Sequence, residues 1–128
     1  MSLCIAAGSK AVTMAVAAFT LSWTHSVEKT RWEEDWLVTP AGLEIVEARV
    51  RGSGAGMEPA EGARLVDGWW IYVPRLGPQP SVMLAASGAT GAGWTLCAEG
   101  RCMTLGAEAG ETVVIRACAA NPSPELDR

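Results

Sequence analysis

The chain has 128 residues, of which 49% are hydrophobic and 19% charged, and its formal net charge at pH 7 is -4. This length and apolar content are sufficient for one domain with a single core, so we expect no second domain. Acidic and basic residues are interspersed without a Lys/Arg cluster, which argues against nucleic-acid binding. No apolar stretch reaches the roughly 18 residues of a spanning helix, so we expect no transmembrane segment.

The N-terminal residues resemble a secretory signal peptide but fit a β-hairpin better. Lys10 and the small residues after it imitate the charged start and the cleavage site of a signal. The apolar region between them would, however, be very short for a signal. A hairpin of residues 3–7 and 10–16, turning at Gly8-Ser9, explains the same residues.

Two alternating stretches, residues 19–27 and 32–38, form the most informative pattern of the sequence. Their apolar side chains recur at every second position, which is typical of half-buried β-strands. His25 in the first stretch and Glu34 in the second both fall on the apolar side. If residues 28–31 form a hairpin loop, antiparallel pairing sets His25 opposite Glu34.

The same register would place Trp23 opposite Trp36, so that tryptophans flank the predicted His25–Glu34 pair. Directly opposed residues have Cβ atoms about 5 Å apart, which allows a hydrogen bond or an ion pair. The pair could be a satisfied part of the core, a site for a small polar ligand or a cation, or a general acid-base pair. The enzyme is the least favoured, because adjacent residues of a strand point to opposite faces, so Ser26 cannot act as the nucleophile beside His25.

The following strand, residues 43–51, changes phase near Val46, which predicts a β-bulge. Without a bulge, Glu47 would extend the row of His25 and Glu34, where two carboxylates and a histidine could hold a cation. We expect the bulge, because it lets the apolar face that begins at Val46 enter the core. Glu47 would then turn to solvent.

Four cysteines leave the redox compartment open. Cys97 and Cys102 flank a predicted two-residue turn at Glu99-Gly100, which makes them a directly opposed pair. A disulfide is geometrically feasible there if the protein is exported, whereas in a reducing cell both would be buried thiols. A zinc site is less favoured, because this spacing lacks a second close pair of ligands, and we predict no cofactor.

The remaining sequence predicts further short strands. Asp67-Gly68 marks a hairpin turn before residues 69–73, whose aromatic side chains fall on both faces. Additional strands are expected at residues 82–85, 94–97, 101–105 and 112–118. About ten strands in all predict a small all-β antiparallel barrel or sandwich with little or no helix, spanning residues 1–118, followed by a loose tail at 119–128.

Residues 19–30, FTLSWTHSVEKT, are followed by Trp32-Glu33-Glu34 and by the glycine-rich Gly54-Ala55-Gly56-Met57. This order of motifs, over roughly residues 19–105, resembles a bacterial family catalogued as domain of unknown function eighteen-fifty. The positions that match the signature of that family are His25, Ser26, Val27, Glu34, Gly54, Gly56 and Met57.

The resemblance implies a role near solute uptake, because members of that family are often encoded beside TRAP transporters of the TAXI type. It suggests an accessory or ligand-sensing protein with a TAXI-type TRAP component as partner, and it supplies no catalytic residue. Some relatives carry a membrane anchor ahead of the domain; we see no obvious one and expect a cytoplasmic protein, with a periplasmic one as the alternative. The candidate binding residues are Trp23, His25, Ser26, Glu34, Trp36, Glu47, Gly54, Gly56 and Met57.

Overall fold

The computed structural model describes residues 1–25, 30–51, 61–85, 93–107, 110 and 112–119, except for the side chain of His25. In this part of the chain eleven strands pair antiparallel in two sheets, and no helix is present that could cross a membrane. The strands are β1 (Ser2–Ala7), β2 (Lys10–Met14), β3 (Ala18–His25), β4 (Thr30–Thr39), β5 (Gly42–Arg51), β6 (Arg64–Val66), β7 (Trp69–Tyr72), β8 (Ser81–Leu84), β9 (Trp94–Ala98), β10 (Arg101–Leu105) and β11 (Val113–Cys118). The prediction of an all-β fold is confirmed, with the two sheets arranged as a sandwich.

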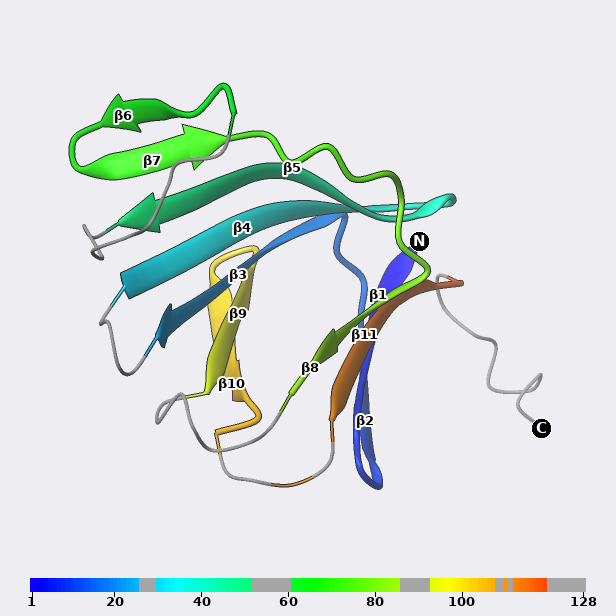
Figure 1. Cartoon of the computed structure of the whole chain (residues 1–128). Coiled ribbons are helices and arrows are strands. Elements are labelled where there is room, and N and C mark those ends of the chain that lie inside the picture. Colours follow the sequence, from blue (N-terminus) through cyan, green and yellow to red (C-terminus); the bar gives the residue numbers. More distant parts are fainter. Residues whose placement is uncertain (26–29, 52–60, 86–92, 108–109, 111, 120–128) are drawn as a thin grey trace.

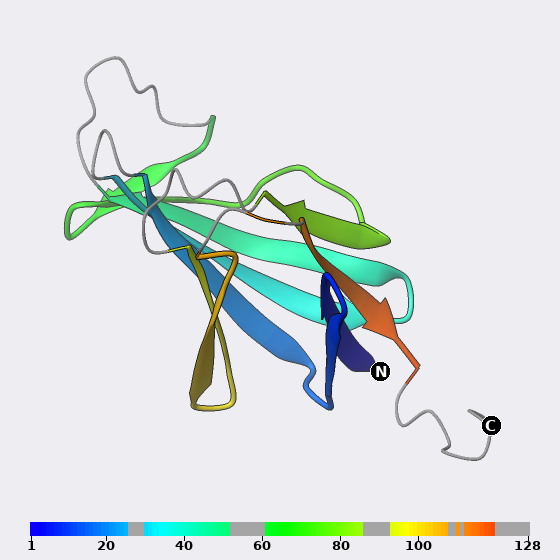
Figure 2. The same cartoon turned by 90° about the horizontal axis from the view of Figure 1, so that it is seen from below.

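The smaller sheet has the strand order β2-β1-β11-β8, and the larger has the order β10-β9-β3-β4-β5-β7-β6. The smaller sheet packs against one face of the larger, towards the end where β4 turns into β5 (Figures 1 and 2). We call this covered face the inner face of the large sheet and the opposite one its outer face. The first hairpin, which we predicted at residues 3–16, is confirmed as β1 and β2.

The core lies between the two sheets and is built from the apolar side chains that alternate along the strands. The buried residues of this core are Leu3, Ile5, Val16, Phe19, Leu21, Trp36, Val38, Leu43, Ile45, Ala48, Leu84, Leu96, Ala98, Val113 and Ile115. The outer end of the inner face, beyond Leu21 along β3, carries side chains that are only partly buried.

The predicted β-bulge is confirmed in β5. The pairing with β4 places Asp35 opposite Glu47 but Trp36 opposite Ile45, so that Val46 is an extra residue. The bulge reverses the phase of the strand, which allows apolar residues on both sides of it to face the core. Val46 itself does not enter the core, because it is the unpaired residue, and it is 40% exposed.

The predicted register of the central hairpin is wrong. β3 ends at His25 and β4 begins at Thr30, and these two residues lie opposite each other. Glu34 is paired with Leu21 instead of His25, and Trp36 with Phe19. The observed register differs from the predicted one by four residues, and a displacement by an even number leaves every side chain on its predicted face, so the alternation could not distinguish the two registers. Contacts between side chains of β3 and β4 select the observed register.

Two disulfides link neighbouring strands, one in each sheet. Cys97 and Cys102 are directly opposed on β9 and β10, as the turn predicted, and they are joined by a disulfide. A second disulfide joins Cys4 of β1 to Cys118 of β11 across a sequence separation of 114 residues. No local pattern predicts this pair, because the two strands become neighbours only in the folded sheet.

We expect the two disulfides to differ in their contribution to stability. A cross-link that closes a loop of about 100 residues stabilises by about 4.7 kcal/mol in the chain-entropy model, whereas a loop of a few residues gives about 2 kcal/mol. Replacing Cys4 and Cys118 by Ala should therefore lower the free energy of unfolding more than replacing Cys97 and Cys102 does. Urea unfolding of both double variants measures this, and equal losses would contradict it.

Candidate functional site

A row of tryptophans crosses the inner face of the large sheet near the ends of β3 and β5. Trp23 lies opposite Trp32, and their rings are stacked with centroids 5.9 Å apart. Trp94 of β9 lies against Trp23 with centroids 4.7 Å apart. On the other side, Val50 lies between Trp32 and Trp70 of β7. We call Trp23, Trp32, Trp70 and Trp94 the tryptophan row, and all four are partly exposed.

Glu34 lies beside the tryptophan row, between Trp32 and Trp36 along β4. Its neighbours on the adjacent strands are Leu21 and Ala48, which are each 1% exposed. The indole Nε1 of Trp36 donates a hydrogen bond of 3.1 Å to Glu34 Oε1. Burial raises the pKa of Glu34, because apolar surroundings penalise the carboxylate, and the hydrogen bond from Trp36 offsets this only in part.

Two hydroxyl groups share this face with the carboxylate. Tyr72 of β7 lies opposite Ala48, which in turn lies opposite Glu34. Burial raises the pKa of Tyr72, and the negative charge of Glu34 raises it further. Thr30 begins β4 on the same side, and its hydroxyl is buried with no hydrogen-bond partner among the described residues. The site thus combines aromatic rings, one carboxylate and two hydroxyl groups.

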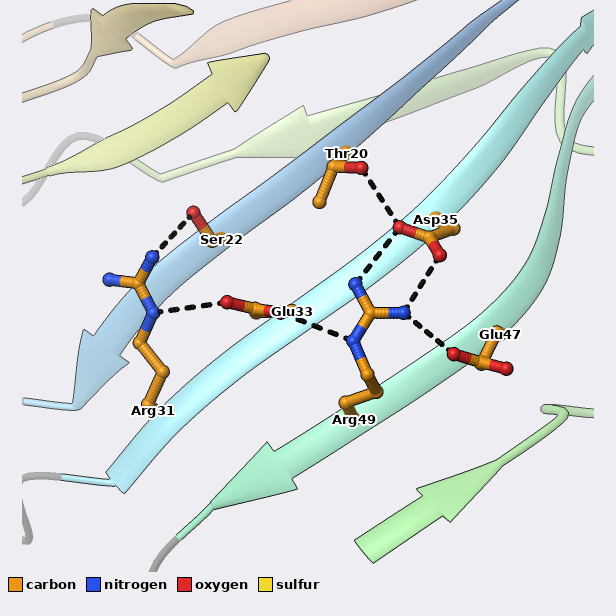
Figure 3. A network of polar contacts seen from close by, with 7 residues as sticks. All are labelled: Thr20, Ser22, Arg31, Glu33, Asp35, Glu47 and Arg49. Atoms are coloured by element: carbon orange, nitrogen blue, oxygen red, sulfur yellow. Dashed lines mark hydrogen bonds and ion pairs between the residues drawn. The ribbon is translucent and has the colours of Figure 1, made fainter. Parts of the chain in front are cut away.

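The outer face of the same strands carries a network of charges centred on Arg49 (Figure 3). Arg49 makes a bidentate contact with the carboxylate of Asp35, in which Nη1 donates to Oδ2 at 2.7 Å and Nη2 donates to Oδ1 at 3.1 Å. It also donates to Glu47 at 2.6 Å and to Glu33 at 3.1 Å. The hydroxyl of Thr20 donates to Asp35 Oδ1 at 2.8 Å, which connects β3 to the network.

The electrostatics of this network are opposite to those of Glu34. Hydrogen bonds from Arg49 lower the pKa of Asp35, more than partial burial raises it. The same contacts raise the pKa of Arg49. Arg31 of β4 donates a further hydrogen bond of 3.1 Å to the hydroxyl of Ser22 in β3. Because its charges are paired, we interpret the network as a structural link that stabilises the packing of β3, β4 and β5.

The structure places the predicted site residues in different surroundings. Trp23, Glu34 and Trp36 are on the inner face, as expected. Glu47 is on the outer face, also as expected, but it is paired with Arg49. The side chain of His25 and the residues Ser26, Gly54, Gly56 and Met57 lie outside the described part of the chain.

Sequence reasoning missed most of the tryptophan row and its polar neighbours. Trp32 was placed on the face of Glu34, but its contact with Trp23 depends on the register, which was wrong. Trp70, Tyr72 and Trp94 come from strands whose order in the sheet the sequence did not predict. Among the described residues, no group of three or more His, Cys, Asp or Glu side chains could hold a metal ion.

Comparison with known proteins identifies a family but no activity. The family model described as "Domain of unknown function (DUF1850)" matches residues 19–105. The matched region begins in β3 and ends in β10, so it contains every strand that contributes to the tryptophan row. Neither the curated proteins nor the solved structures that were compared gave a match.

Replacing Glu34 by Gln should stabilise the protein at pH 7. The pKa of Glu34 is raised in the folded state, so the ionised carboxylate destabilises the folded protein. This destabilisation is complete above the folded-state pKa, and it disappears as the pH falls below the pKa of the unfolded state, near 4.5. Since the group retains some solvent contact, we expect a gain of less than about 1 kcal/mol. Urea unfolding at pH 7 and pH 4 should show the gain only at pH 7.

The matched control for this variant is Glu99→Gln, which removes the same charge at an exposed position of the β9–β10 turn. It should leave the free energy of unfolding unchanged at both pH values. A loss of stability in Glu34→Gln at pH 7 would show that the surroundings favour the carboxylate, contrary to our interpretation.

Replacing Arg49 by Met should destabilise the protein by about 1 kcal/mol at pH 7, because the ion pairs are partly exposed and therefore screened. The folded pKa of Asp35 is lowered, so its stabilising effect exists above the unfolded pKa and is lost as the pH falls through the folded pKa. The difference from the wild type should therefore shrink between pH 5 and pH 3 in urea unfolding. Arg75→Met, at an exposed position, is the control and should show no such dependence.

Proposed function

The chain belongs to the family of domains of unknown function DUF1850, and we propose that it is a ligand-binding module for a small solute with a positively charged nitrogen. The observation that supports this is the position of Glu34, a carboxylate on a largely aromatic and aliphatic face. We propose that the cation of the solute approaches Glu34 and that its apolar groups lie against the tryptophan row.

The electrostatics of Glu34 support a cationic ligand. Its raised pKa means that the surroundings supply less stabilisation of the negative charge than water does. A bound ammonium group would supply the missing charge and lower this pKa. Anionic ligands would add a second negative charge beside the first, which is unfavourable at a partly desolvated position.

The tryptophan row supports the same ligand class. Indole faces attract cations through their quadrupole, and aromatic clusters are a common means of recognising alkylated ammonium groups. Trp23, Trp32 and Trp94 are in mutual contact and retain exposed surface. The hydroxyl group of Tyr72, which retains exposed surface, is available to orient polar parts of the solute.

An accessory role in solute uptake forms the second part of the proposal. It rests on the resemblance to a family often encoded beside TAXI-type TRAP transporters, and we propose a component of such a transporter as the partner. Two disulfides favour an oxidising compartment over the expected cytoplasm, since cytosolic proteins rarely keep them. An acid-base enzyme is not proposed, because Glu34 is not opposite His25.

Choline, putrescine and arginine are suitable probes of the proposed site. We expect at least one of them to quench tryptophan fluorescence with a dissociation constant of roughly 0.1–1 mM. The neutral alcohol 3,3-dimethylbutan-1-ol has the shape of choline without its charge and should bind about tenfold more weakly than choline if choline is the ligand. Glu34→Gln should weaken binding of the cation about tenfold, and titration calorimetry gives the affinities.

The control is again Glu99→Gln, which changes the net charge equally but lies at the opposite end of β9 from Trp94. It should bind the cation like the wild type. The proposal is wrong if none of the three cations binds, or if the Glu34→Gln and Glu99→Gln variants bind with equal affinity.

A further inference from the structure

The disulfide between Cys97 and Cys102 is a reactive site that the proposed function does not use. We propose that it undergoes thiol-disulfide exchange with a small dithiol, and that the attack occurs on Cys102. The pair lies on the β9–β10 hairpin at the edge of the large sheet, and Cys102 is exposed. This site is distinct from the tryptophan row, because Cys97 of β9 and Cys102 of β10 occupy strand positions that face outward, whereas Trp94 faces inward.

Access along the S–S axis distinguishes the two sulfur atoms. An attacking thiolate must approach one sulfur from the side opposite the other, because the new bond forms as the old one breaks. β10 is an edge strand, with β9 as its neighbour, so the approach to Cys102 comes from outside the sheet. The corresponding approach to Cys97 passes over β3, where Thr20 lies opposite Cys97, and Cys97 is only partly exposed whereas Cys102 is exposed. Exchange rates depend on this access.

The second disulfide is less accessible along its S–S axis. Cys4 of β1 is flanked by β2, while Cys118 ends β11 beyond Arg116, the last residue that pairs with β8. Thr13 of β2 lies directly beside Cys4, with 3.6 Å between Oγ1 and Sγ. Both cysteines are also partly buried. The same molecule therefore contains a disulfide with one exposed cysteine and a disulfide with two partly buried cysteines, which provides an internal control.

A cavity of about 400 Å³ adjoins Cys102 and has room for a small dithiol. Its walls include Glu99, Arg101 and Met103 of the hairpin, and residues 13–16 at the end of β2, the edge strand of the small sheet, and just after it. Arg101 brings a positive charge to this cavity, which favours the approach of a thiolate. The negative charge of Glu99 repels anionic reagents, so a neutral dithiol is better suited than one with several carboxylates.

The exchange balances in two steps. One thiolate of the dithiol bonds to Cys102 Sγ, the Cys97–Cys102 bond breaks, and Cys97 leaves as a thiolate that takes up the proton released from the dithiol. The second thiol of the dithiol then attacks the sulfur of the same reagent molecule that is bonded to Cys102. Cys102 leaves as a thiolate and is protonated. The products are two cysteine thiols and the cyclic disulfide of the reagent.

The hairpin should survive this opening. Its strands remain paired through five opposed positions, and the turn residues Glu99 and Gly100 have positive φ angles of 50° and 80°, as a two-residue hairpin turn requires. The short loop means that the disulfide restricts few conformations of the unfolded chain. Opening and closing can therefore occur in the folded protein.

The test uses the full oxidised chain, dithiothreitol, and quenching by acid followed by alkylation and peptide mass spectrometry. Cys97 and Cys102 should become alkylated at least about tenfold faster than Cys4 and Cys118, while the near-ultraviolet circular dichroism of the tryptophans is retained. Equal rates would overturn the proposal. Loss of the tertiary signal together with opening would also overturn it, because the disulfide would then be structural.

A monothiol identifies the attacked sulfur. Brief exposure to β-mercaptoethanol should give a mixed disulfide at Cys102 with Cys97 alkylated, and the reverse distribution would overturn the assignment. Arg101→Gln should slow the opening a few-fold, whereas Arg116→Gln, at an exposed position of β11, should leave the rate unchanged. Equal rates in these two variants would overturn the role of the cavity next to Cys102.

Discussion

The pairing of β3 with β4 is the constraint on which both faces of the large sheet depend. On the inner face it stacks Trp23 on Trp32. On the outer face it sets Thr20 opposite Asp35, and a hydrogen bond of 2.8 Å joins them. A displacement by two residues would break both contacts and keep every side chain on its present face. The register is therefore selected by specific contacts between side chains, whereas hydrophobic burial alone would accept either one.

The bulge in β5 transmits this arrangement to the rest of the sheet. Because Val46 is extra, Ile45 and Ala48 can both face the core although they are three residues apart. The same shift brings Arg49 to the outer face, within reach of the carboxylate of Asp35. On the inner face it places a small side chain opposite Glu34. A larger residue than Ala48 at this position would fill the space beside the carboxylate.

Alternation was sufficient to predict the strands, their faces and the bulge, because each of these depends on the two-residue period of a strand. It was insufficient for the central register, since a slip by an even number of residues preserves that period, and a slip by four therefore gave a wrong partner for Glu34. The turn at Glu99-Gly100 identified Cys97 and Cys102 as neighbours, because that information is local. The bond from Cys4 to Cys118 depends on the order of strands in the sheet, which no local pattern contains.

The contrast between Glu34 and Asp35 suggests why the two faces differ in role. These adjacent residues point to opposite sides of β4, and their pKa values are shifted in opposite directions. Asp35 is neutralised by Arg49 and so contributes to the stability of the folded sheet. Glu34 receives one indole hydrogen bond from Trp36 among the described residues and lies where an apolar side chain would be more stable. A carboxylate kept at such a position costs stability, and recognition of a cation is a physical reason for its presence there.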